Sequence, residues 1–376
     1  MSFKINITVL VAPLDWGLGH CTRCIPLILH FLKLGCTVLV AAEGAQAKLL
    51  QTEFPSITIL PLRGYRIRYS NGKRMFAMKI LWQLPKIIRS IKNEQIWLNG
   101  VVEKHKIDVV ISDNRYGLYH SKIPSILITH QLRVQTPFGW AGQMVQRQIY
   151  KYINQFTTCW VPDSAGEDNL AGKLSHPELM PRVPVVYIGP LSRMQFSGTE
   201  KTAFDLLILL SGPEPQRTLL EEKLIRELTN FTGKVMLVRG LPLSTETLKI
   251  ERATVVNHLP SQQLQTAINQ SEIVISRSGY STVMDLCKLQ KKAILIPTPG
   301  QTEQEYLGKY LQEKGWCLYR DQENFSLKEA VESVQHLQQS FSNILMEDYK
   351  LVVEDLLSTL GKKQHNNTIP LPANKD

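Results

Sequence analysis

A glycine-rich loop near the N-terminus carries the first residues of this chain that could do chemistry. Gly17 and Gly19 let the backbone turn tightly and approach a ligand, and the apolar helix expected behind them favours negative charge at its N-terminus. His20 ends the loop, and an imidazole near neutral pH is the usual general base. We expect His20 to be the base, with Asp15 of the same loop as the alternative. A helix-capping or phosphate-donating role for His20 stays open.

Two loops in the second half of the chain are suited to a nucleotide-linked sugar. Residues 276–285 read Ser-Arg-Ser-Gly-Tyr-Ser-Thr-Val-Met-Asp after an apolar run, so they expose backbone N–H groups at a strand-to-helix turn. Such groups bind a diphosphate. Asp285, one turn into the helix, can accept hydrogen bonds from ribose hydroxyls. The amides and carboxylates of residues 301–304 suit the hydroxyls of a sugar.

The chain offers little that would bind a metal ion. Cys21 and Cys24 have the spacing of zinc and redox sites, but no second CxxC or His pair lies at a suitable distance. We interpret them as packing residues at the start of a helix, and we expect all six cysteines to be free thiols. Folds that neutralise a leaving diphosphate with a metal usually carry an Asp-x-Asp pair, which this sequence lacks. We expect no metal and no other cofactor.

Parallel sheets must position these loops, because apolar, β-branched runs alternate with helical patterns throughout the chain. Ligands of such sheets bind at the carboxyl ends of the strands, so two facing sheets predict a site in the cleft between them. The predicted strands are 5–12, 37–41, 57–60, 108–112, 125–129, 183–188, 204–210, 234–238, 272–275 and 292–296.

Two doubly wound α/β domains therefore follow from the pattern. Residues 1–190 form the first, 191–203 a polar linker and 204–360 the second, and the polar residues 361–376 read as a disordered tail. The chain has 376 residues with 43% hydrophobic content, enough for two cores, and its longest apolar runs are far shorter than a membrane span of about 20 residues. The N-terminus lacks the features of a signal peptide, so we expect a cytoplasmic protein.

Positive charge is concentrated in residues 61–106, which hold eleven of the basic side chains and two acidic ones, in a chain of net charge +10. Such a patch seeks an anionic surface. Within it, residues 75–97 mix lysines and arginines with large apolar side chains, which favours a helix lying on an anionic membrane. An ordinary helix packed on the sheet is the alternative, and Pro85 would interrupt or start a helix.

The whole chain resembles the inverting glycosyltransferases of the GT-B fold, and its second half is similar to the C-terminal domain of family 28, the family of the MurG-type transferases. The run 276–285 followed by Glu303-Gln304 carries this resemblance. It implies that Asp285 holds the ribose and Gln304 the donor sugar, and that the nucleobase lies beside a loop at 257–260. The donor-side residues so implied are Leu259, Arg277, Ser278, Gly279, Ser281, Thr282, Asp285, Glu303 and Gln304.

The resemblance extends to the N-terminal loop and to two further segments. Residues 17–20 are similar to the family's Gly-Gly-His loop, whose histidine faces the acceptor. Ser211 and Gly212 stand where the family has a phosphate-binding loop, although Pro213 removes one N–H donor. The acceptor side is implied at Asp113, Asn114 and Arg115, in a segment that departs from the peptidoglycan enzymes. UDP-N-acetylglucosamine is the family's usual donor, and the acceptor stays undetermined.

In the implied mechanism, His20 or Asp15 deprotonates an acceptor hydroxyl, which attacks the anomeric carbon and inverts its configuration. Helix N-termini and backbone N–H groups stabilise the leaving diphosphate, with Arg277 or Arg217 as further candidates. A lipid-linked, polyprenyl or other cell-envelope glycan would suit the basic segment and place the enzyme at the inner face of the membrane.

Two other functions are compatible with the sequence. A hydrolase or 2-epimerase of nucleotide sugars would share the donor domain and lack a large acceptor. A nucleic-acid-binding protein could use the basic segment, but none of the recognition modules is present, so we expect no nucleic-acid partner.

Overall fold

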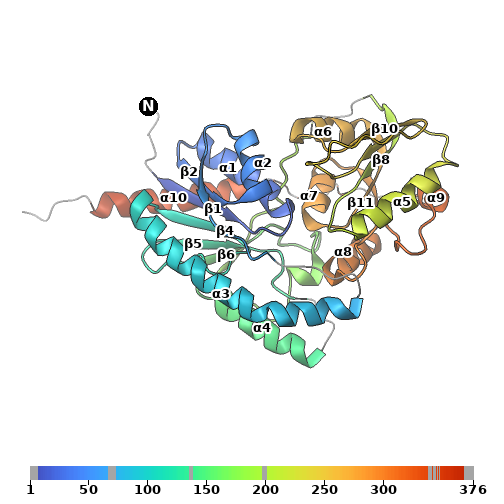
Figure 1. The fold of residues 1–376 in the computed structure, drawn as a ribbon. Helices are drawn as coiled ribbons and strands as arrows, with labels where there is room; N and C mark the ends of the chain where they lie inside the picture. The colour runs from blue at the N-terminus through green and yellow to red at the C-terminus, as the bar shows by residue number, and fades with distance from the viewer. Residues whose placement is uncertain are drawn as a thin grey trace, which may run out of the picture.

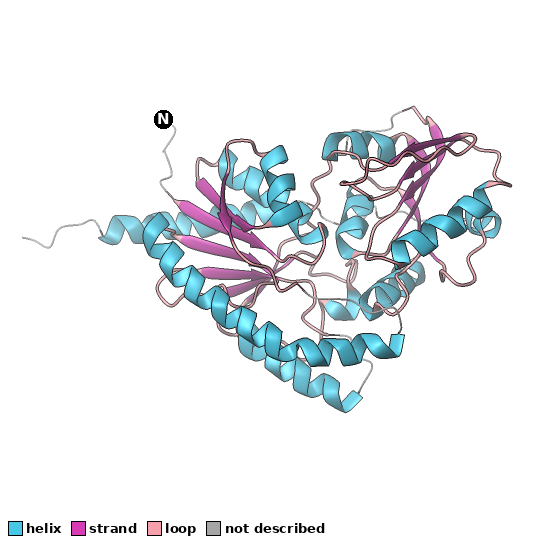
Figure 2. Cartoon of the chain, in the orientation of Figure 1, coloured by secondary structure: helices cyan, strands magenta, loops and turns pink. Residues whose placement is uncertain are grey.

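The structure is a computed structural model that describes residues 7–66, 73–134, 139–196, 201–337, 341, 344, 346 and 348–367. Two sheets, one from each half of the chain, stand side by side with helices on their faces (Figures 1 and 2). All paired strands of both sheets are parallel, which confirms the predicted α/β fold of two doubly wound domains.

The first sheet has the strand order β3-β2-β1-β4-β5-β6-β7. Its central strands are apolar runs buried almost throughout, as a parallel sheet covered on both faces requires. The strands are β1 Thr8–Pro13, β2 Thr37–Ala42, β3 Thr58–Pro61, β4 Val109–Asp113, β5 Ser125–Ile128, β6 Thr158–Val161 and β7 Val185–Tyr187. The helices of this half are α1 Gly19–Lys33, α2 Gly44–Glu53, α3 Lys73–His105 and α4 Gly139–Ile153, with a 3-10 turn at Gly172–Leu174.

The second sheet has the order β10-β9-β8-β11-β12-β13. Its strands are β8 Phe204–Leu209, β9 Val235–Val238, β10 Ala253–Val256, β11 Ser271–Ser276, β12 Lys292–Leu295 and β13 Leu318–Tyr319. The helices are α5 Gln216–Leu228, α6 Ser261–Asn269, α7 Tyr280–Lys288, α8 Thr302–Glu313, α9 Leu327–Gln335 and α10 Asp348–Asn367. In both sheets the strand order reverses beside the first strand, the place where doubly wound folds bind ligands.

The C-terminal helix α10 corrects two parts of the predicted organisation. Residues 361–367, predicted as the start of a disordered tail, continue the helix, and residues 368–376 lie outside the described part. The helix also packs on α1 of the first domain, although residues 204–360 were assigned to the second (Figure 1). Val353 and Leu357 are buried in the same core as Phe31, and the rings of His30 and Tyr349 meet edge to face.

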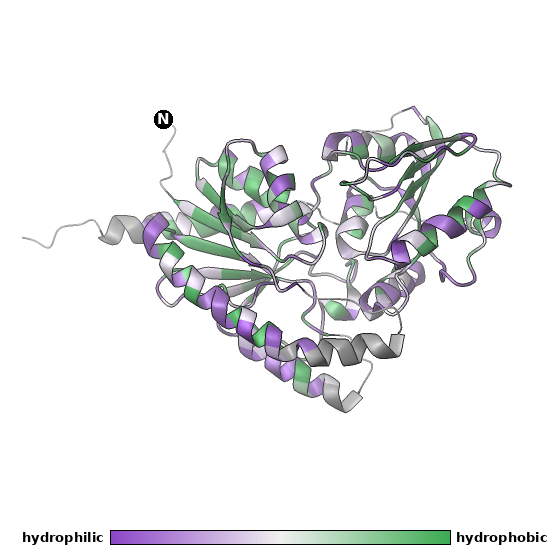
Figure 3. Cartoon of the chain, viewed as in Figure 1, coloured by the Kyte–Doolittle hydropathy of each residue, from purple (hydrophilic) through white to green (hydrophobic). Residues whose placement is uncertain are grey.

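Helices α3 and α4 both lie along the lower edge of the molecule in the view of Figure 1. α3 continues through Pro85, which was expected to interrupt or start a helix. Apolar and polar residues alternate along its described part (Figure 3). Ile91 is buried and Lys92 is exposed. The side chains of residues 73–82 and 84, which include much of the predicted membrane-binding segment, lie outside the described residues. Within the described ranges, no helix is both long and apolar enough to span a membrane.

Candidate active site

Two helix N-termini, one from each domain, meet at the candidate site. α1 follows β1 of the first sheet and α7 follows β11 of the second. The Ser281 hydroxyl of α7 donates a hydrogen bond of 2.9 Å to the carbonyl oxygen of Gly19. A Cβ atom at Gly19 would lie 2.9 Å from that hydroxyl oxygen, so glycine permits the close approach. The predicted loops at 17–20 and 276–285 are thus brought together across the two domains.

His20 lies in the first turn of α1 beside Asp113, the last residue of β4. β4 pairs with β1, with Asp113 opposite Pro13, so the carboxyl ends of the two strands are adjacent. His20 Nδ1 is 3.0 Å from Asp113 Oδ1, and the Asp113 side chain is fully buried. Asp113, predicted on the acceptor side, therefore contacts the predicted base. When Nδ1 donates to the carboxylate, Nε2 is the nitrogen that can take a proton from a substrate.

Arg23, one turn further along α1, is the second partner of Asp113, and no sequence pattern predicts it. Its Nε donates to Asp113 Oδ2 at 2.6 Å and its Nη2 donates to Asp113 Oδ1. Arg23 Nη2 also lies 2.8 Å from His20 Nδ1. Burial alone would raise the pKa of Asp113, but Arg23 and His20 lower that pKa well below its usual range. Burial and Arg23 lower the pKa of His20, against the opposing effect of Asp113.

The chain of polar contacts continues from Arg23 into the second domain through His130. Arg23 Nη1 lies 3.2 Å from His130 Nδ1, and His130 Nε2 lies 2.8 Å from Glu303 Oε1. Gln131 Nε2 donates to the other oxygen of Glu303. Burial would raise the pKa of Glu303, but His130 lowers it. The His130 ring stacks on Tyr280 with 4.0 Å between ring centroids.

His130 and Gln131 are functional candidates that sequence reasoning missed although a signal existed. They follow β5 after one intervening residue, and the residues that follow parallel strands line the ligand crevice of such sheets. The strand 125–129 was predicted, so its polar continuation could have been included.

Asp285, predicted to hold a ribose, is bonded to the segment between the two domains. Ser192 Oγ donates to Asp285 Oδ1 at 2.6 Å, and Arg193 Nη1 donates to Ser261 Oγ at 2.9 Å. Burial raises the pKa of Asp285, and Arg193 and Ser192 act in the opposite direction. The two predicted donor-side carboxylates, Asp285 and Glu303, are thus each bonded to groups of the chain itself.

The two predicted donor loops are fixed to each other. Ser278 Oγ donates to the carbonyl oxygen of Gln304 at 2.7 Å, and Gln304 Oε1 accepts a bond of 2.8 Å from the Thr298 N–H. Gly279 is the N-cap residue of α7, and Thr282 lies in its first turn. The backbone N–H groups at this helix start are the donors expected to face a diphosphate.

The two arginines considered for the diphosphate are both engaged with protein groups. Arg277 is 1% exposed, and its guanidinium donates to the carbonyl oxygens of Gln216, Ile296 and Pro297. Burial lowers the pKa of Arg277 to about 10. Arg217 forms ion pairs with Glu214 at 2.5 Å and with Glu221 at 3.1 Å. Arg277 therefore supports the loops after β11 and β12 from within the domain.

Asp15 joins the N-terminal loop to the segment that follows β3. Its two carboxylate oxygens accept the N–H groups of Tyr65 at 2.8 Å and Arg66 at 2.9 Å. Next to it is a cavity of about 410 Å³, lined by Asp15, Gly17, Leu18, Glu43, Gly44, Ala45, Gln46 and Arg66. The cavity therefore adjoins the loop that carries His20.

The other predicted acceptor-side residues lie at the end of β4. Asn114 has a φ of 55°, in the left-handed region. Arg115 is 1% exposed, pairs with Glu94 at 2.7 Å and donates to the carbonyl oxygens of Pro13 and Arg63. Arg115 thus lies in the interior and ties α3 to β1 and β4.

The predicted phosphate loop follows β8. Gly212 has a φ of 104°, which favours glycine, and a Cβ atom there would lie 3.5 Å from Thr298 Oγ1. Ser211 and Gly212 therefore lie beside the loop that follows β12.

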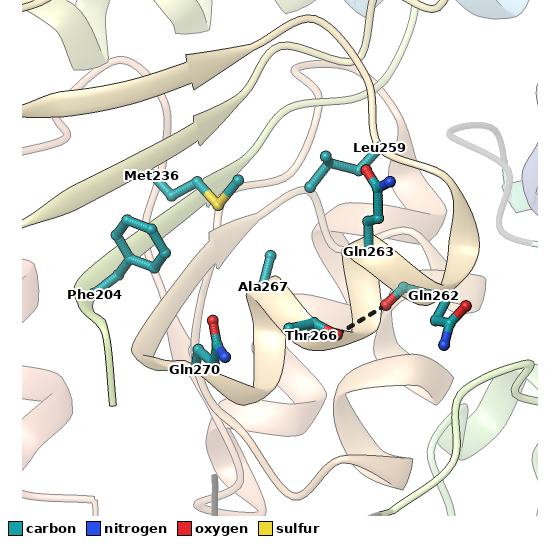
Figure 4. A pocket seen from close by; sticks show the side chains of 8 residues that line it. All are labelled: Phe204, Met236, Leu259, Gln262, Gln263, Thr266, Ala267 and Gln270. Atoms are coloured by element: carbon teal, nitrogen blue, oxygen red, sulfur yellow. Dashed lines mark hydrogen bonds between the residues drawn. The ribbon is translucent and has the colours of Figure 1, made fainter. Parts of the chain in front are cut away.

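Leu259 lines a cavity of about 380 Å³ in the second domain. Figure 4 shows side chains of β8 and β9 facing those of α6 across it. Its lining consists of Phe204, Met236, Leu259, Gln262, Gln263, Thr266, Ala267 and Gln270.

Cys21 and Cys24 are buried, and the six cysteines are free, as predicted. Burial raises the pKa of Cys21 to about 12, and Cys24 Sγ donates to Asp113 Oδ2 at 3.6 Å. Over the ranges that the structure describes, no group of three His, Cys, Asp or Glu side chains is arranged to hold a metal ion.

Comparison with known proteins gives three kinds of match. Residues 216–358 match the glycosyltransferase family 28 C-terminal domain. An uncharacterized glycosyltransferase from Methanosarcina acetivorans is 22% identical over 80% of this chain and 82% of its own. Among solved structures, MurG from Acinetobacter baumannii has a TM-score of 0.55 at 13% identity, over 94% of this chain and 99% of its own. Spinosyn rhamnosyltransferase SpnG, complexed with thymidine diphosphate, has a TM-score of 0.58 at 16% identity, over 95% of this chain and 96% of its own.

Proposed function

We propose a reaction for this GT-B glycosyltransferase, whose residues 216–358 form a family 28 C-terminal domain. The chain transfers a sugar, N-acetylglucosamine or a similar one, from its uridine diphosphate to an acceptor hydroxyl. The configuration at the anomeric carbon is inverted and no metal ion takes part. The observation that carries this proposal is the His20–Asp113 pair at the α1 N-terminus, opposite the α7 N-terminus of the donor domain.

His20 is the base in this reaction. Its Nε2 takes the proton of the acceptor hydroxyl while the hydroxyl oxygen forms a bond to the anomeric carbon and the bond from that carbon to the diphosphate oxygen breaks. Asp113 holds the Nδ1 side of the ring through the 3.0 Å contact. Asp15 is less suited, because both its oxygens already accept backbone N–H groups. The cavity beside Asp15 and Gly17 offers room for the acceptor.

The donor binds to the carboxylates of the second domain by exchange of partners. A ribose hydroxyl replaces Ser192 as the donor to Asp285, and sugar hydroxyls replace His130 and Gln131 as donors to Glu303. Each exchange swaps one hydrogen bond for another, so the carboxylates stay satisfied in both states. The diphosphate lies at the α7 N-terminus, where the N–H groups of residues 279–282 and the helix dipole stabilise the charge of the leaving group.

A lipid-linked glycan at the inner face of a membrane is the acceptor class that we propose. Support comes from the described part of α3, where Lys86, Arg89 and Lys92 are exposed together with Ile88 and Ile96. Ile96 is 72% exposed. Basic and apolar side chains on one exposed helix bind anionic lipid.

Donor turnover tests the proposed reaction. UDP release from UDP-N-acetylglucosamine is measured with excess chelator, with and without a membrane lipid extract, for the wild type, His20→Gln and Asp285→Ala. Glu272→Ala is the matched control, because Glu272 is an exposed carboxylate on the strand that leads to the site.

We expect release that depends on the lipid extract, survives the chelator, persists in the control and is lost in both site variants. Release without any acceptor indicates a nucleotide-sugar hydrolase instead. Restoration of activity only by added divalent metal contradicts metal independence, and the absence of turnover and binding with every nucleotide sugar contradicts the donor class.

A further inference from the structure

Asp113 in the His20–Asp113 pair is shared with a buried cation, Arg23. The guanidinium contacts both carboxylate oxygens of Asp113, and one of its nitrogens lies 2.8 Å from His20 Nδ1. A carboxylate paired only with histidine lends that ring its full negative charge and strengthens it as a base. Here Arg23 offsets that charge, and its side chain is 2% exposed, so water screens it little.

His20 Nδ1 has two neighbours that make opposite demands. Asp113 Oδ1 at 3.0 Å can only accept a hydrogen bond, whereas Arg23 Nη2 at 2.8 Å can only donate one. With a proton on Nδ1, the ring bonds to Asp113 and Nε2 is free to act as the base. With Nδ1 unprotonated, the ring accepts a hydrogen bond from Arg23 and the proton is on Nε2. Nε2 then cannot take a proton from a substrate.

We propose that Arg23 is a positioning residue that sets the protonation state of His20: it holds Asp113 with both oxygens engaged and keeps the imidazole neutral at pH values where a histidine beside a lone carboxylate would be charged. This inference rests on the proposed function of His20 as the base. The charged and titratable groups that face His20 are Arg23 on its own helix, Asp113 at the end of β4, His130 after β5 and Glu303 on α8.

Arg23 also connects the base to the donor side. Its Nη1 contacts His130, whose other ring nitrogen contacts Glu303 of α8. A side chain that served only to neutralise Asp113 would not need this third contact. The base and the proposed sugar-binding carboxylate are therefore two ends of one chain of buried polar contacts.

The test is an NMR titration of the full-length protein with labelled histidines, in which the His20 signal is identified by its loss in His20→Gln. We expect wild-type His20 to titrate below its ordinary pKa of 6.5. The role of Nε2 as the base also requires the neutral ring to carry its proton on Nδ1. In Arg23→Met the His20 pKa should rise by about 1–3 units, because the nearby cation is gone and Asp113 remains. In Arg23→Lys the charge is kept, so the pKa should stay low while kcat falls through the lost two-point hold on Asp113.

Arg239→Met is the matched control, because Arg239 is another largely buried arginine in a carboxylate pair, in the other domain. It should lower thermal stability without moving the His20 pKa. The acid limb of kcat/KM against pH should shift upward in Arg23→Met alone. If Arg23 had a purely structural role, the acid limb of kcat/KM against pH would lie at the same pH in Arg23→Met and Arg23→Lys.

The inference is overturned if wild-type His20 titrates at or above pH 6.5. This measurement is made on the wild type, so it does not depend on whether a variant folds. The inference is also overturned if a folded Arg23→Met protein keeps the wild-type His20 pKa. The NMR measurement requires no turnover. If the His20 pKa rises in Arg23→Met but the wild type transfers no sugar, the proposed function is wrong and the role of Arg23 stands.

Discussion

Replacing Asp113 with Asn should separate what this carboxylate does for stability from what it does for the base. Asp113 is fully buried and is the counter-ion of Arg23. Removing one partner of a buried ion pair costs about 3–5 kcal/mol. At about 2–4 °C per kcal/mol for a domain of this size, the melting temperature should fall by about 6–20 °C.

The same change should slow transfer for a different reason. The Asn side chain can donate to His20 Nδ1, which would leave the proton on Nε2 and remove a general base worth about 10²–10⁴-fold in kcat. The double variant Asp113→Asn with Arg23→Met removes both charges, so most of the lost stability should return. The rate should stay low, because a neutral amide cannot stabilise the positive charge that His20 acquires when it takes the proton.

Thermal melting by circular dichroism and single-turnover kinetics with saturating donor measure the two effects. If the single variant Asp113→Asn has the melting temperature and the transfer rate of the wild type, the role assigned to the His20–Asp113 pair is refuted. Recovery of both stability and rate in the double variant would show that Asp113 serves only as the counter-ion of Arg23.

Three further outcomes follow from the structure. Gly117→Ala should cost about 1–3 kcal/mol in a urea titration, because its Cβ would lie 2.2 Å from the Ile91 carbonyl oxygen; an unchanged midpoint contradicts that packing. Leu357→Ala on α10 should cost about 2–5 kcal/mol by thermal melting, while Leu351→Ala, which is 71% exposed on the same helix, should cost little; equal effects would argue against docking of α10. Since the His20 pKa is lowered by folding, the unfolded chain binds a proton that the folded chain does not, so wild-type stability should fall as pH drops through about 6.5; His20→Gln should flatten that fall, and an unchanged slope would contradict it.

The fold was predictable wherever a strand is a long apolar run. β1 and β4 are five or six residues of buried, mostly β-branched character, and both were found. β6, β10 and β13 were not predicted. β10 and β13 are the two edge strands of the second sheet, and β10 is only partly buried, so the apolar pattern of a buried strand is weak there. The end of α10 was missed because residues 361–367 are polar, and a polar segment can still extend a helix that is anchored by its earlier turns.

The candidate site was predictable where polar residues stand in the segment between a strand and the next helix. His20 and Glu303 lie in segments that the pattern marked, and the structure joins them in one series of polar contacts through Asp113, Arg23 and His130. Arg23 was not predictable in this way, since a lone arginine on an amphipathic helix is normally solvated. Its burial depends on Asp113, ninety residues later in the chain, and on pairing of β1 with β4.

The chain crosses between the two domains twice, once between β7 and β8 and again between α9 and α10, because α10 returns to pack on α1. Two domains joined by a single chain segment could rotate relative to each other in any direction about that segment. Two connections leave one easy motion, rotation about the line that joins them. A rotation of one domain relative to the other would therefore turn about that line, and it would have to break the contacts that join the domains, Ser281 with Gly19 and His130 with Glu303.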